Sequence, residues 1–170
     1  IAGYGKLAEM LGDQETADKY LQTAKEMAGK WKEMAMDGDH YKLTFDKPGT
    51  WSQKYNLVWD KLLKLQIFPE KVAETEIAYY LTKQNKYGLP LDNRETYTKT
   101  DWIMWTATLA NDKATFEKFI EPVYLFMNVT PNRVPMSDWV FTDEPNQRGF
   151  QARSVVGGYY IKMLEGKLIK

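Results

Sequence analysis

Apolar side chains recur at the spacing of helix faces through most of this chain, and this pattern restricts it to a mainly α-helical fold. Residues at positions i, i+3, i+4 and i+7 share one face of a helix. In the first segment these positions hold Tyr4, Leu7, Ala8 and Leu11. Gly12 can then end that helix in the left-handed conformation, and Asp13 can cap the next one. A link this short predicts that the first two helices form an antiparallel hairpin.

The same spacing predicts a second helix up to residue 35 and five more helices downstream. Their apolar faces fall at residues 55–65, 69–81, 102–109, 116–127 and 156–163. Pro69 suits the first position of its helix, whereas Pro122 lies inside a helix and should kink it. The helix at 102–109 is apolar nearly all round, so we expect it to be buried. Three helix pairs and a terminal helix, with long loops after alternate helices, indicate an all-α fold that forms part of an (α/α) toroid.

One segment between the helices has the period of a strand. Residues 40–46 alternate between polar and apolar side chains, and Pro48-Gly49 favours a type II turn. We therefore predict a small β-hairpin or extended insertion near residues 40–53. His40, at its start, is expected on the surface near a turn.

Two later features suggest close packing. Residues 130–150 show no periodicity and hold three prolines, which indicates a long loop, and Trp139 and Phe141 favour an ordered, packed one. The last helix contains the pair Gly157-Gly158, although glycine costs roughly 1 kcal/mol relative to alanine inside a helix. Such a pair suits a place where another backbone or a ligand comes close, or a tight helix crossing.

Composition excludes several classes of function. The 170 residues include 23 basic and 23 acidic side chains, so the zero net charge gives no electrostatic surface for nucleic acid. There is no cysteine and one histidine, which excludes thiolate and multi-histidine metal sites built within the chain. No apolar run reaches the roughly 18 residues of a membrane span. We therefore expect no metal, no cofactor, no nucleic-acid partner and no membrane span.

The start of the chain is also informative. Residues 1–11 already have a helical pattern, with no capping residue and no targeting stretch ahead of them. We therefore expect residues 1–170 to be a single-domain fragment of a longer polypeptide. Because three hairpins make only part of a toroid, the chain should expose an apolar seam where the rest of the domain docks. The remainder of its own polypeptide is thus an expected partner.

The segment richest in chemistry runs from residue 87 to 106. Gly88-Leu-Pro90 cannot continue a helix, because proline has no N–H and disfavours the α conformation of the residue before it. The residues that follow are mostly polar and end in two tryptophans at a helix start: Asp92, Asn93, Arg94, Glu95, Tyr97, Lys99, Asp101, Trp102 and Trp105. Such loops on a helical frame tend to carry binding and catalysis. An ordinary solvated loop, capped at Thr100 or Asp101, is the alternative.

Four segments stand out by their sequence. They are YNLVWDKLLKLQIFP at 55–69, KYGLPLDNRETYTKTDWIMWTATLA at 86–110, NRVPMSDW at 132–139 and ARSVVGGYY at 152–160. Together, and in this order and spacing, they resemble the C-terminal half of the six-hairpin domain in the fungal and bacterial glutaminase A family. The resemblance covers essentially the whole chain. It implies a fold similar to that of six-hairpin glycosidases and hydrolysis of L-glutamine to L-glutamate and ammonia. It also implies a secreted, periplasmic or cell-envelope parent protein, whose β-rich N-terminal regions are absent here.

Glutamine presents an α-carboxylate and an α-ammonium, which call for an arginine and an acid. All four arginines lie in or beside the loops described above, and Arg94 and Arg153 are our choices for binding a carboxylate. Tyr97, Trp102 and Trp105 are the expected aromatic contacts of a small-molecule substrate. Each arginine also has a plainer interpretation, in which it pairs with a neighbouring Asp and holds a loop.

For acid–base chemistry we choose Asp101, then Asp92 and Asp60. Asp101 lies at a helix N-terminus, where the macrodipole favours the ionised form. That placement suits a carboxylate base or an ammonium ligand, and helix capping is the alternative. Asp92 follows Pro90 in the loop, and Asp60 lies on the third helix.

Three functions remain open at this point. The first is part of a glutaminase-like amidohydrolase with its site in the toroid funnel. The second is a six-hairpin glycoside hydrolase that acts on a sugar with two acids, flanked by aromatic platforms among Trp51, Trp102, Trp105 and Trp139. The third is a helical scaffold whose catalytic residues lie elsewhere in the polypeptide.

Overall fold

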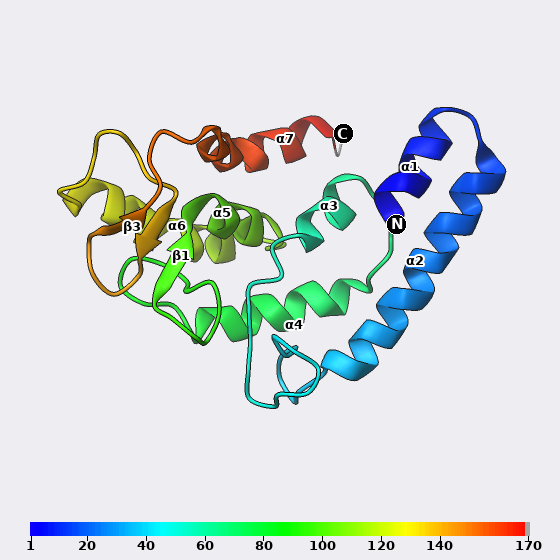
Figure 1. Cartoon of the computed structure of the whole chain (residues 1–170), viewed down its shortest axis with the longest axis horizontal. Helices are drawn as coiled ribbons and strands as arrows, with labels where there is room; N and C mark the ends of the chain where they lie inside the picture. The colour runs from blue at the N-terminus through cyan, green and yellow to red at the C-terminus, as the bar shows by residue number, and fades with distance from the viewer. Residues whose placement is uncertain (169–170) are drawn as a thin grey trace.

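The computed structural model describes residues 1–168, and its helices follow the predicted order (Figure 1). The helices are α1 (Ala2–Met10), α2 (Gln14–Ala35), α3 (Leu57–Leu62), α4 (Glu70–Leu81), α5 (Thr100–Thr108), α6 (Lys113–Val129), the 3-10 helix η1 (Ser154–Tyr160) and α7 (Ile161–Leu168). The strands are β1 (Tyr97–Lys99), β2 (Trp139–Phe141) and β3 (Gln147–Gly149), which form one antiparallel sheet in the order β1-β2-β3. The prediction of a mainly helical chain is confirmed.

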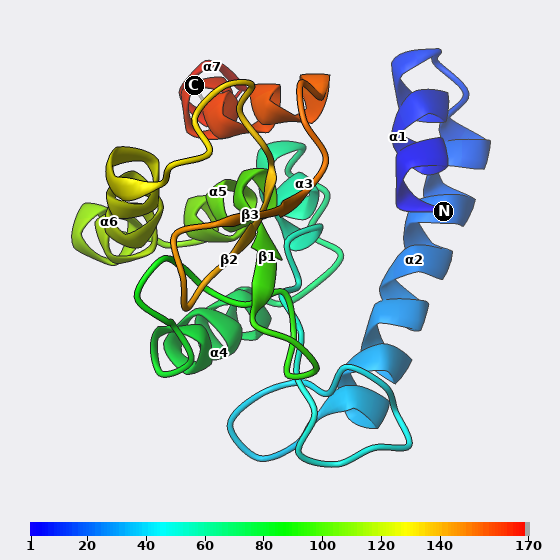
Figure 2. The same ribbon diagram turned by 60° about the vertical axis from the view of Figure 1, so that its left-hand side comes forward.

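The α1–α2 hairpin forms as predicted. Gly12 ends α1 with φ +80°, and the Asp13 carboxylate accepts the Thr16 N–H at 3.1 Å to cap α2. Gly5 allows the close crossing, because a Cβ at this position would lie 2.9 Å from Leu21 Cγ. Figure 2 shows the hairpin at one side of the molecule, joined to the remaining helices through the C-terminal end of α2.

The insertion after α2 is extended, but it is not a β-hairpin. In the described residues, its strand-like pattern yields isolated bridges, between Met36 and Tyr41 and between Ser52 and Asp92. The predicted surface position of His40 is also wrong: the side chain is buried, its ring stacks on Tyr79 at 4.1 Å, and Nε2 lies 3.2 Å from the Thr50 carbonyl oxygen. Of the three alternating apolar side chains, Tyr41 is buried against Trp31, whereas Leu43 is half-buried and Phe45 is 47% exposed.

The sheet lies where the sequence shows no strand period. Thr98 of β1 pairs with Val140 of β2, and β2 continues into β3 with a register shift at Trp139 and Val140. Three-residue strands are too short to produce a recognisable alternation. The loop at 130–150 is nevertheless ordered and packed, as predicted, and Val140 is fully buried.

The main core surrounds α5. It joins Val58 of α3, Ile77 of α4, Phe119 of α6 and Ile161 of α7 to Ile103 of α5. The predicted burial of α5 is confirmed. Helix α6 continues through Pro122, which lies in its interior.

Several helices also present apolar side chains to solvent. On α1 and the turn after it, the exposed residues are Tyr4, Leu7, Met10 and Leu11, and on η1 and α7 they are Tyr160, Met163, Leu164 and Leu168. Met10 and Leu11 are 75% and 76% exposed. Exposed apolar surface of this kind is typical of an interface. Among the described residues, no helix combines the length and the apolar character needed to cross a membrane.

Candidate functional site

The start of α5 meets the residue Tyr55, just before α3, and the C-terminal part of η1. Tyr55, just before α3, stacks on Trp102 of α5 with ring centroids 4.1 Å apart. Helix η1 packs along α5, which begins directly after strand β1, and a long loop precedes α3. The first backbone N–H groups of an α-helix lack intrahelical partners and carry partial positive charge. The start of α5 is therefore suited to polar and anionic groups.

Asp101 lies in the first turn of α5 and is only 4% exposed. Among the described residues its Oδ1 atom has no hydrogen-bond partner. Burial, together with the nearby negative charge of Asp138, raises the pKa of Asp101 to about 6. Burial thus outweighs the helix dipole in setting this pKa, although a carboxyl with a pKa of about 6 is still mostly ionised at neutral pH. The capping interpretation also fails, since no side chain caps α5.

Asp138 is the second buried acid of this site. It precedes β2, is 1% exposed, and its backbone oxygen accepts the Thr100 N–H at 2.9 Å. Its Oδ2 atom accepts a hydrogen bond from Lys99 Nζ at 2.9 Å and lies 3.5 Å from Arg153 Nη1. Oδ1 has no partner within the described chain. Sequence reasoning missed Asp138, although it lies within the NRVPMSDW segment.

Tyr159 of η1 also belongs to the polar cluster at the start of α5. Its hydroxyl lies 2.5 Å from Thr100 Oγ1. Burial and the charges of Asp101 and Asp138 raise the pKa of Tyr159 to about 12. The phenol therefore stays protonated at neutral pH, and because the Thr100 hydroxyl donates to the Asp138 carbonyl oxygen, Tyr159 donates its proton to Thr100 Oγ1. Sequence reasoning did not select Tyr159 either.

Gly158 brings η1 directly onto Asp101 and Trp105. A Cβ at this position would lie 3.0 Å from Asp101 Cβ and 2.9 Å from Trp105 Nε1. The close approach predicted for the glycine pair is confirmed at Gly158, whereas a Cβ at Gly157 would have nothing within 4 Å. Trp105 Nε1 is another buried polar atom without a partner among the described residues.

Gly158→Ala should destabilise the protein by about 1–3 kcal/mol, because the added methyl group would crowd Asp101 Cβ and Trp105 Nε1 in a fully packed contact. Gly157→Ala is the matched control and should leave stability unchanged or slightly increased. The midpoints of urea unfolding of the two variants measure the difference. Equal midpoints would show that η1 does not pack on α5 in this way.

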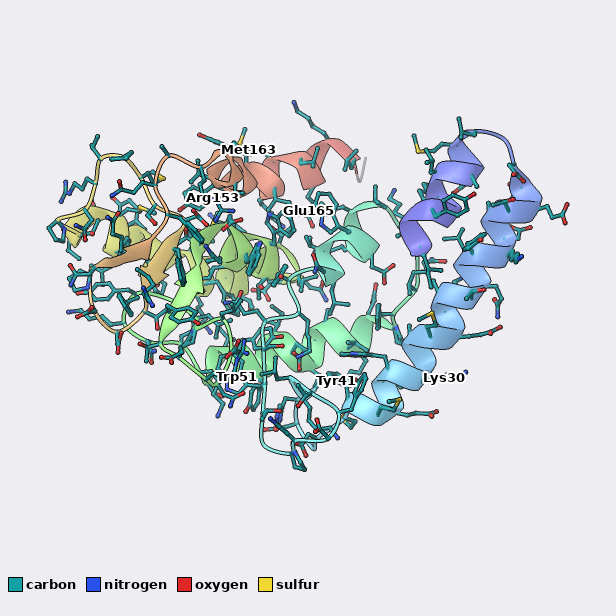
Figure 3. All side chains as sticks on the ribbon, in the orientation of Figure 1. Lys30, Tyr41, Trp51, Arg153, Met163 and Glu165 are labelled. Atoms are coloured by element: carbon teal, nitrogen blue, oxygen red, sulfur yellow. The ribbon has the colours of Figure 1, made fainter. Side chains whose placement is uncertain are left out.

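The predicted site residues do not all meet. Helix α5 carries Asp101, Trp102 and Trp105. Arg153 is linked to this cluster by its ion pair with Asp138. Figure 3 shows Arg153 between η1 and α5. Tyr97 borders the same region through an edge-on contact with Trp139, at 5.4 Å between ring centroids.

Asp92 and Arg94 instead bind each other. Arg94 Nε and Nη2 donate to the two carboxylate oxygens of Asp92 at 2.9 and 2.6 Å. Burial alone would raise the pKa of Asp92, but the hydrogen bonds and charge of Arg94 lower it overall. The plainer interpretation, an arginine that holds its own loop, describes this pair.

Asp60 also has a structural role. Its two carboxylate oxygens accept the backbone N–H groups of Ile67 and Phe68 at 2.9 and 2.8 Å, which fixes the turn between α3 and α4. Asp60 also lines a cavity of about 570 Å³, whose wall includes Tyr55 and Trp59. The Trp59 ring is in edge-on contact with Trp105 of α5, at 5.2 Å between ring centroids. That volume is in the range of small-molecule sites.

A separate buried network joins the 36–56 loop to α4. Glu76 is fully buried. Its carboxylate accepts hydrogen bonds from the Tyr41 N–H at 2.8 Å and from the Tyr80 hydroxyl. It also forms a salt bridge with Lys54 Nζ at 3.5 Å. Burial lowers the pKa of Lys54 and, with Glu76, raises that of Tyr80 well above its usual value. Figure 3 shows Tyr41 in the loop beneath α4. The signal in the sequence was Glu76 itself, an acid one turn before Tyr80 on the apolar face of its helix.

The described residues contain no group of three or more His, Cys, Asp or Glu side chains that could hold a metal ion. The chemistry available at the α5 cluster is therefore that of buried acids, a phenol, an indole N–H and two cations.

Comparison with known sequences places this chain in a family. The model of the glutaminase A six helical-hairpin domain matches residues 1–163. Glutaminase A of Aspergillus oryzae (strain ATCC 42149 / RIB 40) is 28% identical over 171 residues, which cover 96% of this chain and 25% of that protein. A probable glutaminase of Arthroderma benhamiae (strain ATCC MYA-4681 / CBS 112371) is 27% identical over 198 residues, with 94% and 22% covered. The chain thus spans about a quarter of the length of these relatives. Its family resemblance is confirmed, and the chain belongs to the glutaminase A six helical-hairpin domain family.

Proposed function

We propose that this chain supplies the acid–base centre of a hydrolase that converts L-glutamine to L-glutamate and ammonia. The observation that supports the proposal is the state of Asp101, a buried carboxyl with a pKa of about 6 whose Oδ1 atom has no hydrogen-bond partner among the described residues. Perturbed acids of this kind gather at catalytic sites, because an acid–base group works best with a pKa near the working pH. The names of the relatives support glutamine as the substrate.

In this mechanism the ionised Asp101 takes a proton from a water molecule, whose oxygen attacks the side-chain carbonyl carbon of glutamine. Trp105 Nε1–H, which has no partner among the described residues, is the donor that we assign to the developing oxyanion. The protonated Asp101 then returns the proton to the departing nitrogen as the C–N bond breaks. The products are ammonia and the γ-carboxyl group of glutamate.

We further propose that the chain forms the C-terminal half of an (α/α) toroid, whose remaining hairpins belong to the same longer polypeptide. The exposed apolar residues of α1 and α7 are the proposed seam. In this arrangement, the polar cluster at the start of α5 would face the toroid funnel.

The isolated 170-residue chain should self-associate or unfold, and it should be inactive, because the seam is left in water. Light scattering and an ammonia assay test this expectation. Replacement of Met10 and Leu11 by glutamate should reduce the association. A monodisperse monomer with full activity would contradict the proposed seam.

Glycoside hydrolysis is the second candidate. Its supporting observation is the Tyr55–Trp102 stack next to Asp101, since aromatic faces bind sugars and a buried carboxyl with a pKa of about 6 suits a general acid. Ammonia release from L-glutamine by the full-length polypeptide, run beside a screen of oligosaccharides, separates the two functions. Ammonia release without sugar cleavage supports the glutaminase, and the reverse supports the glycosidase.

A further inference from the structure

Asp138 is a buried acid that the backbone fixes beside the first turn of α5. Its carbonyl oxygen accepts the Thr100 N–H at 2.9 Å and the Thr100 hydroxyl at 3.2 Å, and Thr100 directly precedes Asp101. Asp138 is 1% exposed, and its carboxylate pairs with Lys99 Nζ at 2.9 Å. Because water is excluded from this place, the charge of Asp138 acts on Asp101 with little screening.

Lys99 is held on Asp138 from several sides. Its side chain is 12% exposed, and its ammonium lies over the rings of Trp139 and Phe150, at 4.8 and 4.3 Å from the ring centroids. Lys99 is the last residue of β1, directly before α5, and it pairs with Trp139 of β2. The ion pair, the two cation–π contacts and the sheet register therefore fix the position of this cation relative to Asp101.

The other polar groups that face Asp101 carry a screened charge or none. Arg153 Nη1 lies 3.5 Å from Asp138 Oδ2, but 41% of the Arg153 side chain is exposed, so water screens its charge. Tyr55, just before α3, and Tyr159 of η1 also lie near Asp101. Both phenols stay neutral at neutral pH, because burial and the charge of Asp101 raise their pKa.

The remaining helices packed on α5 bring no comparable charge to its first turn within the described chain. Helix α6 contributes apolar side chains to the core that it shares with α5. Lys61 of α3 pairs with Glu165 of α7 at 2.9 Å, and it also donates to the Thr108 carbonyl oxygen at 2.8 Å. Since Thr108 is the last residue of α5, this ion pair lies at the opposite end of the helix.

We propose that Lys99 is a positioning residue, which holds the Asp138 carboxylate beside Asp101 so that these two opposite charges set the pH at which Asp101 loses its proton. Burial has the largest effect and raises the pKa of Asp101; the charge of Asp138 raises it further, and that of Lys99 lowers it. The inference rests on the proposed function for its effect on catalysis, because it adjusts the acid–base group to neutral pH.

The pH dependence of kcat/KM for L-glutamine in the full-length polypeptide is the first test. Asp138→Asn removes the repelling charge and should move the acidic limb about one pH unit below its wild-type position. Lys99→Met should move the limb about one pH unit upward, because without this cation the two acids together hold a proton more tightly. Arg153→Gln should move the limb upward by less, since the charge of Arg153 is screened.

Two further variants separate the effect of charge from that of packing. Lys99→Arg keeps the cation, so the limb should stay at its wild-type pH even where the rate falls. Lys86→Met is the matched control, because Lys86 also lies over a ring, that of Tyr87 at 5.1 Å, but is exposed and lies outside the Asp138 cluster. Its removal should leave the limb unchanged.

Urea unfolding at several pH values gives a second test that needs no activity. The gain in unfolding free energy caused by Asp101→Asn grows with the difference between the folded and unfolded pKa of Asp101. In a chain that carries Asp138→Asn this gain should be smaller and complete at lower pH, because the folded pKa moves towards the unfolded one. In a chain that carries Lys99→Met it should be larger and complete at higher pH.

Limbs and stability profiles that keep their wild-type positions in Asp138→Asn and Lys99→Met would overturn the inference. Shifts of the same sign in both variants would also overturn it. Should Asp138→Asn fail to fold, equal limbs in Lys99→Met and Lys99→Arg overturn it on their own. Stability profiles that shift as described, in a polypeptide that releases no ammonia from L-glutamine, would support the charge arrangement and refute the proposed function alone.

Discussion

Asp101→Asn in the full-length polypeptide should lower kcat for L-glutamine by a factor of about 10²–10⁴, the usual contribution of a positioned acid–base group. The amide cannot take the proton from water or return it to the departing nitrogen. The shape of the side chain is retained, so KM should change little. Initial rates of ammonia release measure both constants.

The same variant should be more stable than the wild type at neutral pH. The pKa of Asp101 is about 6 in the folded chain and close to 3.9 in an unfolded one, so the folded state binds the proton more tightly. The stability contributed by the protonated carboxyl is fully present below pH about 4 and is lost as the pH rises through about 6. A difference of about two pKa values corresponds to about 3 kcal/mol.

Asp101→Asn avoids this loss of folding stability, because the asparagine side chain does not ionise. Its gain in unfolding free energy over the wild type should therefore be small at pH 4 and approach about 3 kcal/mol above pH 7. Urea unfolding at several pH values measures the gain. Asp92→Asn is the control: its carboxylate is bound by Arg94, so this change should reduce stability at pH 7 and leave kcat nearly unchanged. A lower kcat for Asp92→Asn than for Asp101→Asn would move the site to the Asp92–Arg94 loop.

Glu76→Ala should have the largest effect on stability, a loss of about 3–5 kcal/mol. The substitution leaves the Lys54 ammonium buried without its acid and removes the acceptor of the Tyr41 N–H and the Tyr80 hydroxyl. Because this network joins the 36–56 loop to α4, the loop should also lose protection from amide hydrogen exchange. Thermal and urea unfolding of the full-length polypeptide measure the loss.

Glu74→Ala is the matched control for this prediction. Glu74 lies on the same helix, but its ion pair with Lys71 at 3.4 Å is solvent-exposed, and such pairs contribute about 0–1 kcal/mol. The double substitution Lys54→Met with Glu76→Ala should be less destabilised than Glu76→Ala alone, since no unpaired buried charge remains. Equal losses for Glu74→Ala and Glu76→Ala would show that the network does not stabilise the fold.

Much of the fold was predictable because long helices repeat their signal. The helical period of α1, the Gly12 stop and the Asp13 cap agree with one another, and the structure has the helix, the stop and the cap. The side chains that carry the period are nevertheless mostly exposed: Tyr4, Leu7 and Leu11 are each more than half exposed. The short strands were not predictable, because three residues carry too little pattern. His40 was misplaced because its burial depends on Tyr79, which lies about forty residues away in the sequence and reaches it only in the folded chain.

The site was predictable only in part, for a related reason. Asp101, Trp105 and Arg153 could be selected from their loops and helix starts. Asp138 and Tyr159 could not, since their importance comes from their distance to Thr100, Lys99 and Asp101 across three elements. The raised pKa of Asp101 likewise depends on burial under η1, which a helix-start argument does not include.

The pH dependence of kcat/KM for L-glutamine in the full-length polypeptide tests the central claim most directly. If Asp101 is the base, kcat/KM should rise with pH and level off, with an apparent pKa of about 6. This acidic limb should disappear from the residual activity of Asp101→Asn. A limb at the pKa of an ordinary exposed carboxyl, or one that persists in Asp101→Asn, would contradict the assignment of Asp101 as the acid–base group.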